Sequence, residues 1–243
     1  MVLPDSKTVH NGSMYSSSVT TGDFEQFIAH DVVSYIDAHH RTIANRASRG
    51  LIGHSMGGYG AARIGMKRSD VFGSLYIMSP CCLAVRGAGP ANPADEKALE
   101  TLKTPADSAG LPFGLRAQLA SAAAWSPDPK NPPLYLDLPM KNGVADPEVL
   151  AKWTANAPLA FVDQYIGNLR QYRAIAIDVG DQDGLQAARA SCMRSWIVTA
   201  LPTLSKSIPE LIPARWPIVF KTTSCRFSAS IWSTKIEKAP STD

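Results

Sequence analysis

The hydrophobic residues of this chain follow two alternating patterns. Short apolar runs, typical of buried strands, lie at residues 49–53, 73–79 and 174–179. Apolar residues at helical spacing occur from Phe24 to Ile36, and a small-residue, helix-compatible segment covers 57–68. Thr21 or Asp23 is placed to cap the first of these helices. The alternation predicts an α/β layer fold with a mostly parallel sheet flanked by helices.

Residues 84–160 do not keep this rhythm, because they are rich in Pro, Ala and Gly. Helical pieces are expected near 113–124 and 147–155, and we interpret the segment as a helical and irregular cap inserted over the sheet. A helix is predicted from Phe161 to Tyr172, and Met1–Asp5 has the pattern of a strand end. The predicted organisation is one α/β domain over 1–198, followed by an irregular tail over 199–243.

Composition excludes several classes of protein. The 243 residues are 45% hydrophobic and carry a net charge of +3, which describes an ordinary globule of one large domain. No Arg/Lys stripe alternates with aromatic residues, so nucleic acid is not expected as a partner. No run of 18 apolar residues predicts a membrane span, and no signal peptide is visible, so the default expectation is the cytoplasm. The four cysteines have no redox or zinc spacing.

The chemistry of the chain centres on the G-x-S-x-G pattern of residues 53–57. It stands between a predicted strand and a predicted helix, which is the setting of a nucleophile elbow. The tight turn there favours small residues two positions to either side of Ser55. Ser55 is then the candidate nucleophile, and the backbone N–H of Met56 points to where an oxyanion forms.

Four segments together resemble the esterase D family of α/β-hydrolases, which includes S-formylglutathione hydrolase, feruloyl-esterase-like and antigen 85-like members. They are Gly12–Tyr15 with the Phe24 helix and Arg41-Thr42, the elbow through Ala61, Asp70 to Pro80, and the Gly180-x-x-Asp183 loop. The resemblance covers roughly residues 1–188. It implies an α/β-hydrolase fold and a Ser–His–Asp triad that acts on carboxylic esters or thioesters without metal or cofactor. Asp183 takes the acid role, with Asp178 and Asp181 as rivals; a helix-capping role for Asp183 is the alternative.

The histidine of that pattern is missing, because no histidine follows Asp183. Among the five that precede it, His10 lies in a loop that can approach the site and is the candidate substitute base. His54 should point away from the Ser55 hydroxyl and pack, while His39 and His40 end a helix. His30 is expected to be a surface or core residue.

Two further departures from the family pattern affect the ends of the chain. The start resembles a strand from well inside the family's domain, so the upstream strands and the second oxyanion donor are expected to be missing. The second departure concerns the C-terminal segment, for which we expect a one-base frameshift near Leu185–Cys192. When the codons of residues 205–212 are read in the shifted frame, they permit the sequence F-E-x-Y-P-G-T-H, which is similar to the family's histidine segment.

These observations leave three functions open. The first is a serine hydrolase of small-molecule esters or thioesters that works through an acyl-enzyme on Ser55. The second is an inactive or crippled remnant without a triad histidine, and the third is an acyltransferase with the same nucleophile. An acyl or aromatic pocket under the cap is expected to be lined by Tyr15, Trp125, Tyr135 and Trp153, for which ordinary core packing is the alternative.

Overall fold

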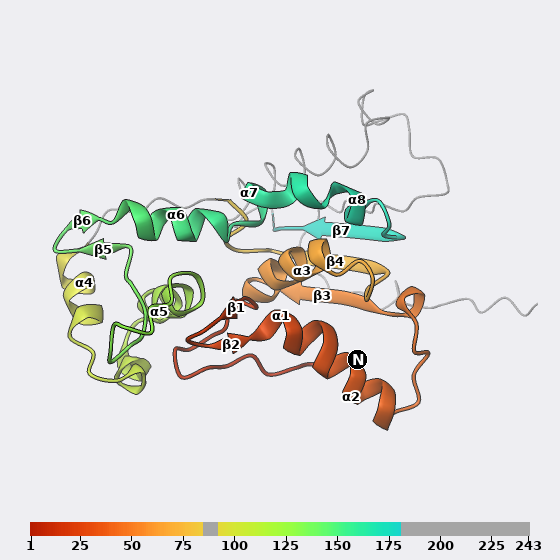
Figure 1. Cartoon of the computed structure of the whole chain (residues 1–243), viewed down its shortest axis with the longest axis horizontal. Coiled ribbons are helices and arrows are strands. Elements are labelled where there is room, and N and C mark those ends of the chain that lie inside the picture. Colours follow the sequence, from red (N-terminus) through yellow and green to blue (C-terminus); the bar gives the residue numbers. More distant parts are fainter. Residues whose placement is uncertain (85–91, 181–243) are drawn as a thin grey trace, which may run out of the picture.

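The computed structural model describes residues 1–84 and 92–180 (Figure 1). The strands are β1 Ser17–Ser18, β2 Gly22–Asp23, β3 Gly50–His54, β4 Ser74–Met78, β5 Met140–Lys141, β6 Val144–Ala145 and β7 Ala174–Asp178. The α-helices are α1 Phe24–Gln26, α2 Val32–His39, α3 Met56–Lys67, α4 Pro93–Glu100, α5 Phe113–Trp125, α6 Pro147–Ala155, α7 Pro158–Phe161 and α8 Ile166–Leu169. A π-helical turn covers Phe27–Asp31, and 3-10 turns cover Arg46–Ser48, Pro105–Gly110 and Val162–Tyr165.

A three-stranded parallel sheet, in the order β3-β4-β7, forms the centre of the described fold. All three of its strands were predicted from the apolar runs. The register sets His54, Met78 and Asp178 level with one another at the carboxyl ends of the strands. These ends point toward the cap in Figure 1, so the residues after each strand face the inserted segment.

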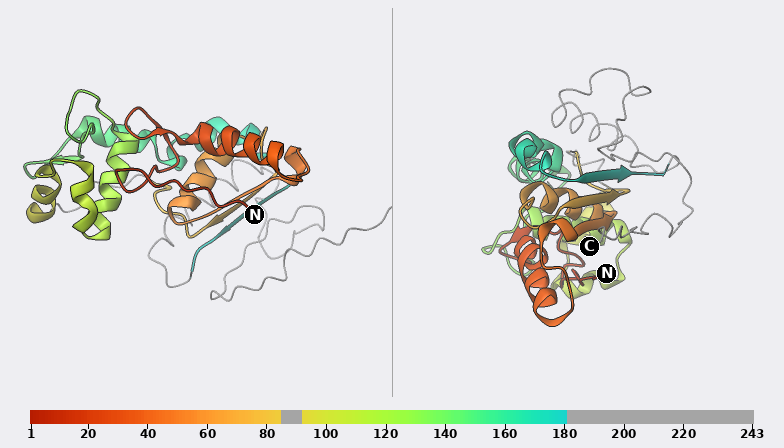
Figure 2. Two further views of the ribbon diagram at one scale, coloured as in Figure 1. Left: turned by 90° about the horizontal axis from the view of Figure 1, so that it is seen from below. Right: turned by 90° about the vertical axis from the view of Figure 1, so that its right-hand side faces the viewer.

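Helices cover one face of this sheet, as the turned views of Figure 2 show. Small residues on α3, such as Ala61 and Ala62, let that helix pack closely on Ile77 and Ile177. The helix of residues 24–39 packs beside it through Ile28 and Ala29, and a π-helical turn interrupts its α-helical pattern. Asp23 caps its start by accepting a hydrogen bond from the Gln26 N–H at 2.9 Å, as predicted.

Residues 92–157, which fall within the cap predicted over about 84–160 and are called the cap below, have a core of their own between α4, α5 and α6. Its buried residues are Leu99, Leu115, Leu119, Ala122, Ala123, Leu134 and Leu136. The helical pieces expected in this segment correspond to α5 and α6, and a short β5–β6 ribbon joins the cap's two halves. The domain boundary at residue 198 and the tail over 199–243 lie outside the described residues and stay predictions.

Two local predictions were wrong. Met1–Asp5 form no strand, because Pro4 offers no N–H to a ladder and the Asp5 carboxylate instead accepts a turn hydrogen bond from the Lys7 N–H at 2.9 Å. Residues 161–172 are not one helix. Phe161 and Tyr165 leave helical geometry, with φ of −130° and −116°, so that α7, a 3-10 turn and α8 follow one another.

The predicted fold class is confirmed as an α/β-hydrolase-type arrangement: a parallel sheet flanked by helices, with a tight strand-to-helix turn between β3 and α3. Within residues 1–84 and 92–180, no helix is both long and apolar enough to cross a bilayer.

Candidate active site

Ser55 occupies a strained backbone position between β3 and α3. Its φ of 55° and ψ of −113° lie in a region that residues with a Cβ rarely adopt. Backbone contacts on three sides hold it there. The Ser55 N–H donates to the Met78 carbonyl at 3.0 Å, and its own carbonyl accepts from the N–H groups of Tyr59 at 3.0 Å and Cys81 at 3.2 Å. Hydrogen bonds to α3 and to the chain at and after the end of β4 therefore hold Ser55 in this strained conformation.

The Ser55 hydroxyl does not cap α3, the helix that follows it. Serine at a helix N-cap ordinarily accepts a hydrogen bond from the first turn, yet Ser55 makes no such side-chain contact with α3. The residue is half-buried. This strand-turn-helix geometry is compatible with the nucleophile elbow predicted at Ser55.

Glycines permit this turn by close approach. A Cβ on Gly53 would lie 1.9 Å from the Gly57 carbonyl oxygen, and one on Gly58 would lie 2.7 Å from the Met78 carbonyl oxygen. At Gly57 the nearest atom to such a Cβ is the Tyr15 hydroxyl oxygen, 4.0 Å away. Before Ser55, the close backbone contact requires a glycine at Gly53, as predicted. After Ser55, it requires a glycine at Gly58 and not at Gly57.

Met56 is the first residue of α3, so its N–H has no carbonyl partner within the helix. The N-terminus of a helix carries partial positive charge, which favours an anion beside it. The position of Met56 is therefore compatible with the oxyanion-donor role predicted for it.

Asp178, one of the two rivals of Asp183 for the acid role, ends β7. Its carboxylate accepts a short hydrogen bond from the Tyr76 hydroxyl on the neighbouring strand. Asp181 and Asp183 lie outside the described residues, so the assignment of Asp183 as the triad acid stays a prediction.

All five histidines of the chain lie within residues 1–54, and none is hydrogen-bonded to Ser55. His10 is 2% exposed, and its Nε2–H donates to the Leu134 carbonyl of the cap at 2.9 Å. The His39 Nδ1–H donates to the Tyr35 carbonyl at 2.8 Å, and His30 is an exposed helix residue beside Asp31. The packing role predicted for His54 is wrong. Its ring is exposed, because β3 is an end strand of the described sheet and His54 points away from α3.

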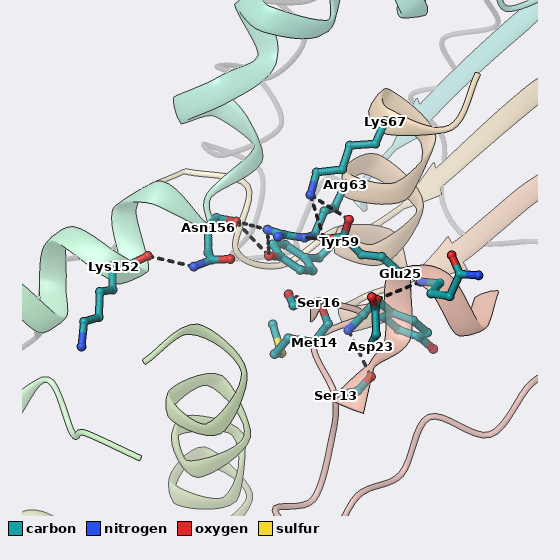
Figure 3. Close-up of polar contacts among 12 residues, drawn as sticks. Ser13, Met14, Ser16, Asp23, Glu25, Tyr59, Arg63, Lys67, Lys152 and Asn156 are labelled. Atoms are coloured by element: carbon teal, nitrogen blue, oxygen red, sulfur yellow. Dashed lines mark hydrogen bonds and ion pairs between the residues drawn. The ribbon is translucent and has the colours of Figure 1, made fainter. Parts of the chain in front are cut away.

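A buried polar network, drawn in Figure 3, joins the helix that carries the elbow to two other segments. The Tyr59 hydroxyl donates to the Asn156 carbonyl at 2.8 Å, and the Arg63 guanidinium reaches the Tyr59 hydroxyl at 3.1 Å. Arg63 also pairs with Glu25 at 2.7 Å, and Lys67 binds the same carboxylate at 2.8 Å. Burial raises the pKa of the Tyr59 phenol, which keeps its proton available for the Asn156 carbonyl. The network fixes both the N-terminal helix and the end of the cap to α3.

A small apolar hollow lies between the cap and the sheet layer, with a free volume of about 10 Å³, which is room for about one water. It is lined by Cys82, Ala84, Trp125, Trp153 and Ala157. Of the four aromatic residues expected to line a pocket, Trp125 and Trp153 do so. Tyr135 is 47% exposed on the surface, and Tyr15 instead packs its ring under Gly60 of α3.

Sequence reasoning missed the polar network and the contribution of Cys82. One signal was present, since Arg63 interrupts a run of small and apolar residues on a helix expected to be buried. A charged residue at such a position needs a partner, and Glu25 is that partner. No comparable signal marks Asn156, because its backbone carbonyl makes the contact. Among the described residues, no group of three or more His, Cys, Asp or Glu could hold a metal ion.

Comparison with known proteins places the chain in a family. A search of curated proteins finds no match. Eleven chains of solved structures match, among them a ferulic acid esterase with a TM-score of 0.49 and 20% sequence identity. That alignment covers 88% of this chain and 58% of the other, so this chain spans less than two thirds of that protein's length. The family model described as "Putative esterase" matches residues 9–203, which is most of the chain and includes the whole described sheet. The chain therefore belongs to the Putative esterase family of hydrolases.

Proposed function

We propose that this protein is a serine hydrolase of small-molecule carboxylic esters or thioesters that forms an acyl-enzyme on Ser55. The observation that carries the proposal is the strained backbone of Ser55, together with a hydroxyl that does not cap α3. A strained residue persists only where its surroundings hold it, and such residues gather at active sites. Membership of an esterase family agrees with this chemistry.

In the proposed reaction the Ser55 oxygen attacks the acyl carbon, and the proton of its hydroxyl passes to a base. The carbonyl oxygen becomes an oxyanion, which the Met56 N–H at the start of α3 stabilises. Collapse of this intermediate breaks the bond to the alcohol or thiol, which takes the proton and leaves the acyl group on Ser55. Water then repeats the sequence and releases the acid. Asp183 remains the proposed triad acid, acting by orienting and stabilising a protonated histidine.

The base is the part of this mechanism with least support in the described residues. No histidine is hydrogen-bonded to Ser55, and the ring of His10 is directed to the Leu134 carbonyl. This favours a second candidate function, the crippled esterase, in which Ser55 is acylated but deacylation is slow. Triad members act as a unit, so loss of the base removes most of the rate.

A burst assay with p-nitrophenyl acetate separates these functions. We expect about one equivalent of nitrophenolate per chain to be released rapidly, since one serine is acylated in each molecule. Ser55→Ala should abolish that burst, and intact-mass analysis should find the acetyl group on Ser55 in the unmutated chain. Ser79→Ala is the matched control, because Ser79 is another half-buried serine at the carboxyl edge of the sheet.

Three outcomes have distinct meanings. A burst followed by steady turnover supports the complete hydrolase, and loss of the turnover in His10→Gln would identify His10 as the base. A burst without turnover supports the crippled esterase. A burst that survives Ser55→Ala would show that the nucleophile is another residue.

A further inference from the structure

Tyr15 lies in a strained turn just before β1. Met14 and Tyr15 have φ of 47° and 46°, which residues with a Cβ rarely adopt, and here two such residues occur in succession. The Ser16 N–H donates to the Ser13 carbonyl at 3.2 Å, and the Tyr15 N–H donates to the Ser13 hydroxyl oxygen at 3.1 Å. Met14 packs beside Tyr59 of α3 (Figure 3). The turn is therefore fixed against the helix that follows the candidate nucleophile.

The phenol ring of Tyr15 lies along α3 and extends toward the start of that helix. A Cβ on Gly60 would lie 2.5 Å from Cδ2 of the ring and 2.9 Å from the Cβ of Tyr15, so a glycine is needed for this close approach. At the other end of the ring, the hydroxyl oxygen is 4.0 Å from where a Cβ on Gly57 would stand. Because Gly57 and Gly60 share one face of the helix, the phenol runs from Gly60 back toward Met56 and Ser55.

The hydroxyl of Tyr15 plays no part in holding this packing. Within residues 1–84 and 92–180 it has no hydrogen-bond partner, whereas the hydroxyls of Tyr59 and Tyr172 each donate to a backbone carbonyl, at 2.8 Å and 2.6 Å. Tyr15 is half-buried, so the end of its side chain can be reached from solvent. A phenol O–H beside the first turn of α3 is thus available to a bound molecule.

The proposed reaction forms an oxyanion at this same place. Its charge develops beside the Met56 N–H at the start of α3. An oxyanion accepts more than one hydrogen bond, and active sites that stabilise one combine backbone N–H groups with side-chain donors that include tyrosine. The turn at Met14 and Tyr15 is also a second strained segment next to the strained Ser55, and strained residues gather at active sites.

We infer that Tyr15 is a further catalytic residue of the Ser55 site, whose hydroxyl donates a hydrogen bond to the oxyanion beside the Met56 N–H. The inference rests on the proposed function, because the oxyanion forms only if Ser55 attacks an acyl carbon. No covalent bond to Tyr15 forms or breaks. Its O–H stays intact, and the hydrogen bond strengthens as charge develops on the carbonyl oxygen. The hydroxyl therefore stabilises the transition state more than the bound ester, and it should affect acylation and not ester binding.

Tyr15→Phe tests this role, because it removes the hydroxyl and leaves the ring on Gly60. Stopped-flow measurement of the p-nitrophenyl acetate burst gives the acylation rate constant and the dissociation constant of the ester separately. We expect the rate constant to fall by about 10²-fold, the loss typical of one oxyanion donor, and the dissociation constant to stay within about twofold. The midpoint of urea denaturation should not change. Tyr135→Phe is the matched control, because Tyr135 also has a positive φ, 56°, but its side chain is exposed on the cap.

A change of the acceptor atom gives a readout that a merely structural role would not move. Sulfur is a weaker hydrogen-bond acceptor than oxygen, so p-nitrophenyl thionoacetate, with C=S in place of C=O, gains less from an oxyanion donor. The unmutated chain should be acylated faster by the oxo ester than by the thiono ester. That preference should fall by about tenfold or more in Tyr15→Phe and stay unaltered in Tyr135→Phe.

Gly60→Ala reaches the same hydroxyl by a second route. A methyl group there meets the Tyr15 ring at 2.5 Å and displaces it, while alanine itself favours the helix. We expect Gly60→Ala to slow acylation in the unmutated background. In Tyr15→Phe the same substitution should have little effect on the rate constant, because no hydroxyl is left to displace.

Failure of this inference can be told apart from failure of the proposed function. An acylation rate constant in Tyr15→Phe within about twofold of the unmutated chain, with a burst that still depends on Ser55, would overturn the inference and leave the serine hydrolase standing. Equal falls for the oxo and the thiono ester would also overturn it, because the loss would then be structural. If the unmutated chain gives no burst that depends on Ser55, the proposed function is wrong, and the role of Tyr15 is overturned with it.

Discussion

The sheet layer and the cap meet beside Ser55, and different kinds of contact hold each of them. In the sheet layer the geometry is set by backbone: ladder hydrogen bonds between β3, β4 and β7, and glycines such as Gly53 at which main chain touches main chain. In the cap it is set by side chains, with leucines and alanines around α5 and the tryptophan pair facing the elbow. The candidate nucleophile is thus placed by main-chain contacts that leave little room for a larger residue, whereas the cap is held by side-chain packing.

The largest expected effect is at the backbone contact in the sheet layer. Gly53→Ala puts a methyl group 1.9 Å from the Gly57 carbonyl oxygen, so either the turn moves or the protein is destabilised. We expect a loss of about 3 kcal/mol or more in the free energy of unfolding, measured by urea denaturation, and no Ser55-dependent burst.

Gly57→Ala is the matched control within the same motif. A Cβ there meets nothing closer than 4.0 Å, and alanine favours the helix that Gly57 occupies. Its stability should be unchanged or slightly higher. Equal damage from the two substitutions would show that the turn is not fixed by the Gly53 contact.

The next effect concerns the network that joins the two parts. Glu25→Gln leaves the buried Arg63 guanidinium and the Lys67 ammonium without their shared carboxylate. Removing one member of a largely buried pair strands the other charge, and we expect a loss of about 2 kcal/mol in urea denaturation. Asp70→Asn, which breaks the more exposed pair with Arg68, should cost about 0.5 kcal/mol or less. If Glu25→Gln lowers the free energy of unfolding no more than Asp70→Asn does, the network does not hold the N-terminal helix to α3.

The same contrast explains how much could be predicted from the sequence. The three strands, the turn at Ser55 and the Asp23 cap follow from local patterns, because short apolar runs, glycine spacing and capping residues act within a few positions. The contact of Tyr59 with Asn156 joins residues 97 positions apart, and no local pattern encodes it. The prediction of one helix over 161–172 was wrong for a related reason. Tyr172 lies after α8 with its side chain buried, and its hydroxyl donates to the Gly65 carbonyl at 2.6 Å. Apolar spacing alone does not distinguish such a buried turn from a helix.

The smallest effect is one of pH, at the point where the N-terminal segment meets the cap. Burial lowers the pKa of His10 below the ordinary value of a histidine, and the hydrogen bond to the Leu134 carbonyl opposes that shift. The Nδ1 atom of the ring is buried and has no hydrogen-bond partner among the described residues. The folded protein therefore takes up a proton at His10 at lower pH than the unfolded chain does.

The sign of the effect follows from that difference in proton binding. Above about pH 6.5 the imidazole is neutral in both states, and His10 adds no pH dependence. As the pH falls below that value, the unfolded chain binds the proton first, so folding stability falls until the lowered pKa of the folded state is reached. His10→Gln keeps an N–H donor for Leu134 but cannot titrate, so its urea midpoint should fall less than that of the unmutated chain between about pH 7.5 and pH 5.5. Parallel losses in the two proteins would assign the acid sensitivity to groups other than His10.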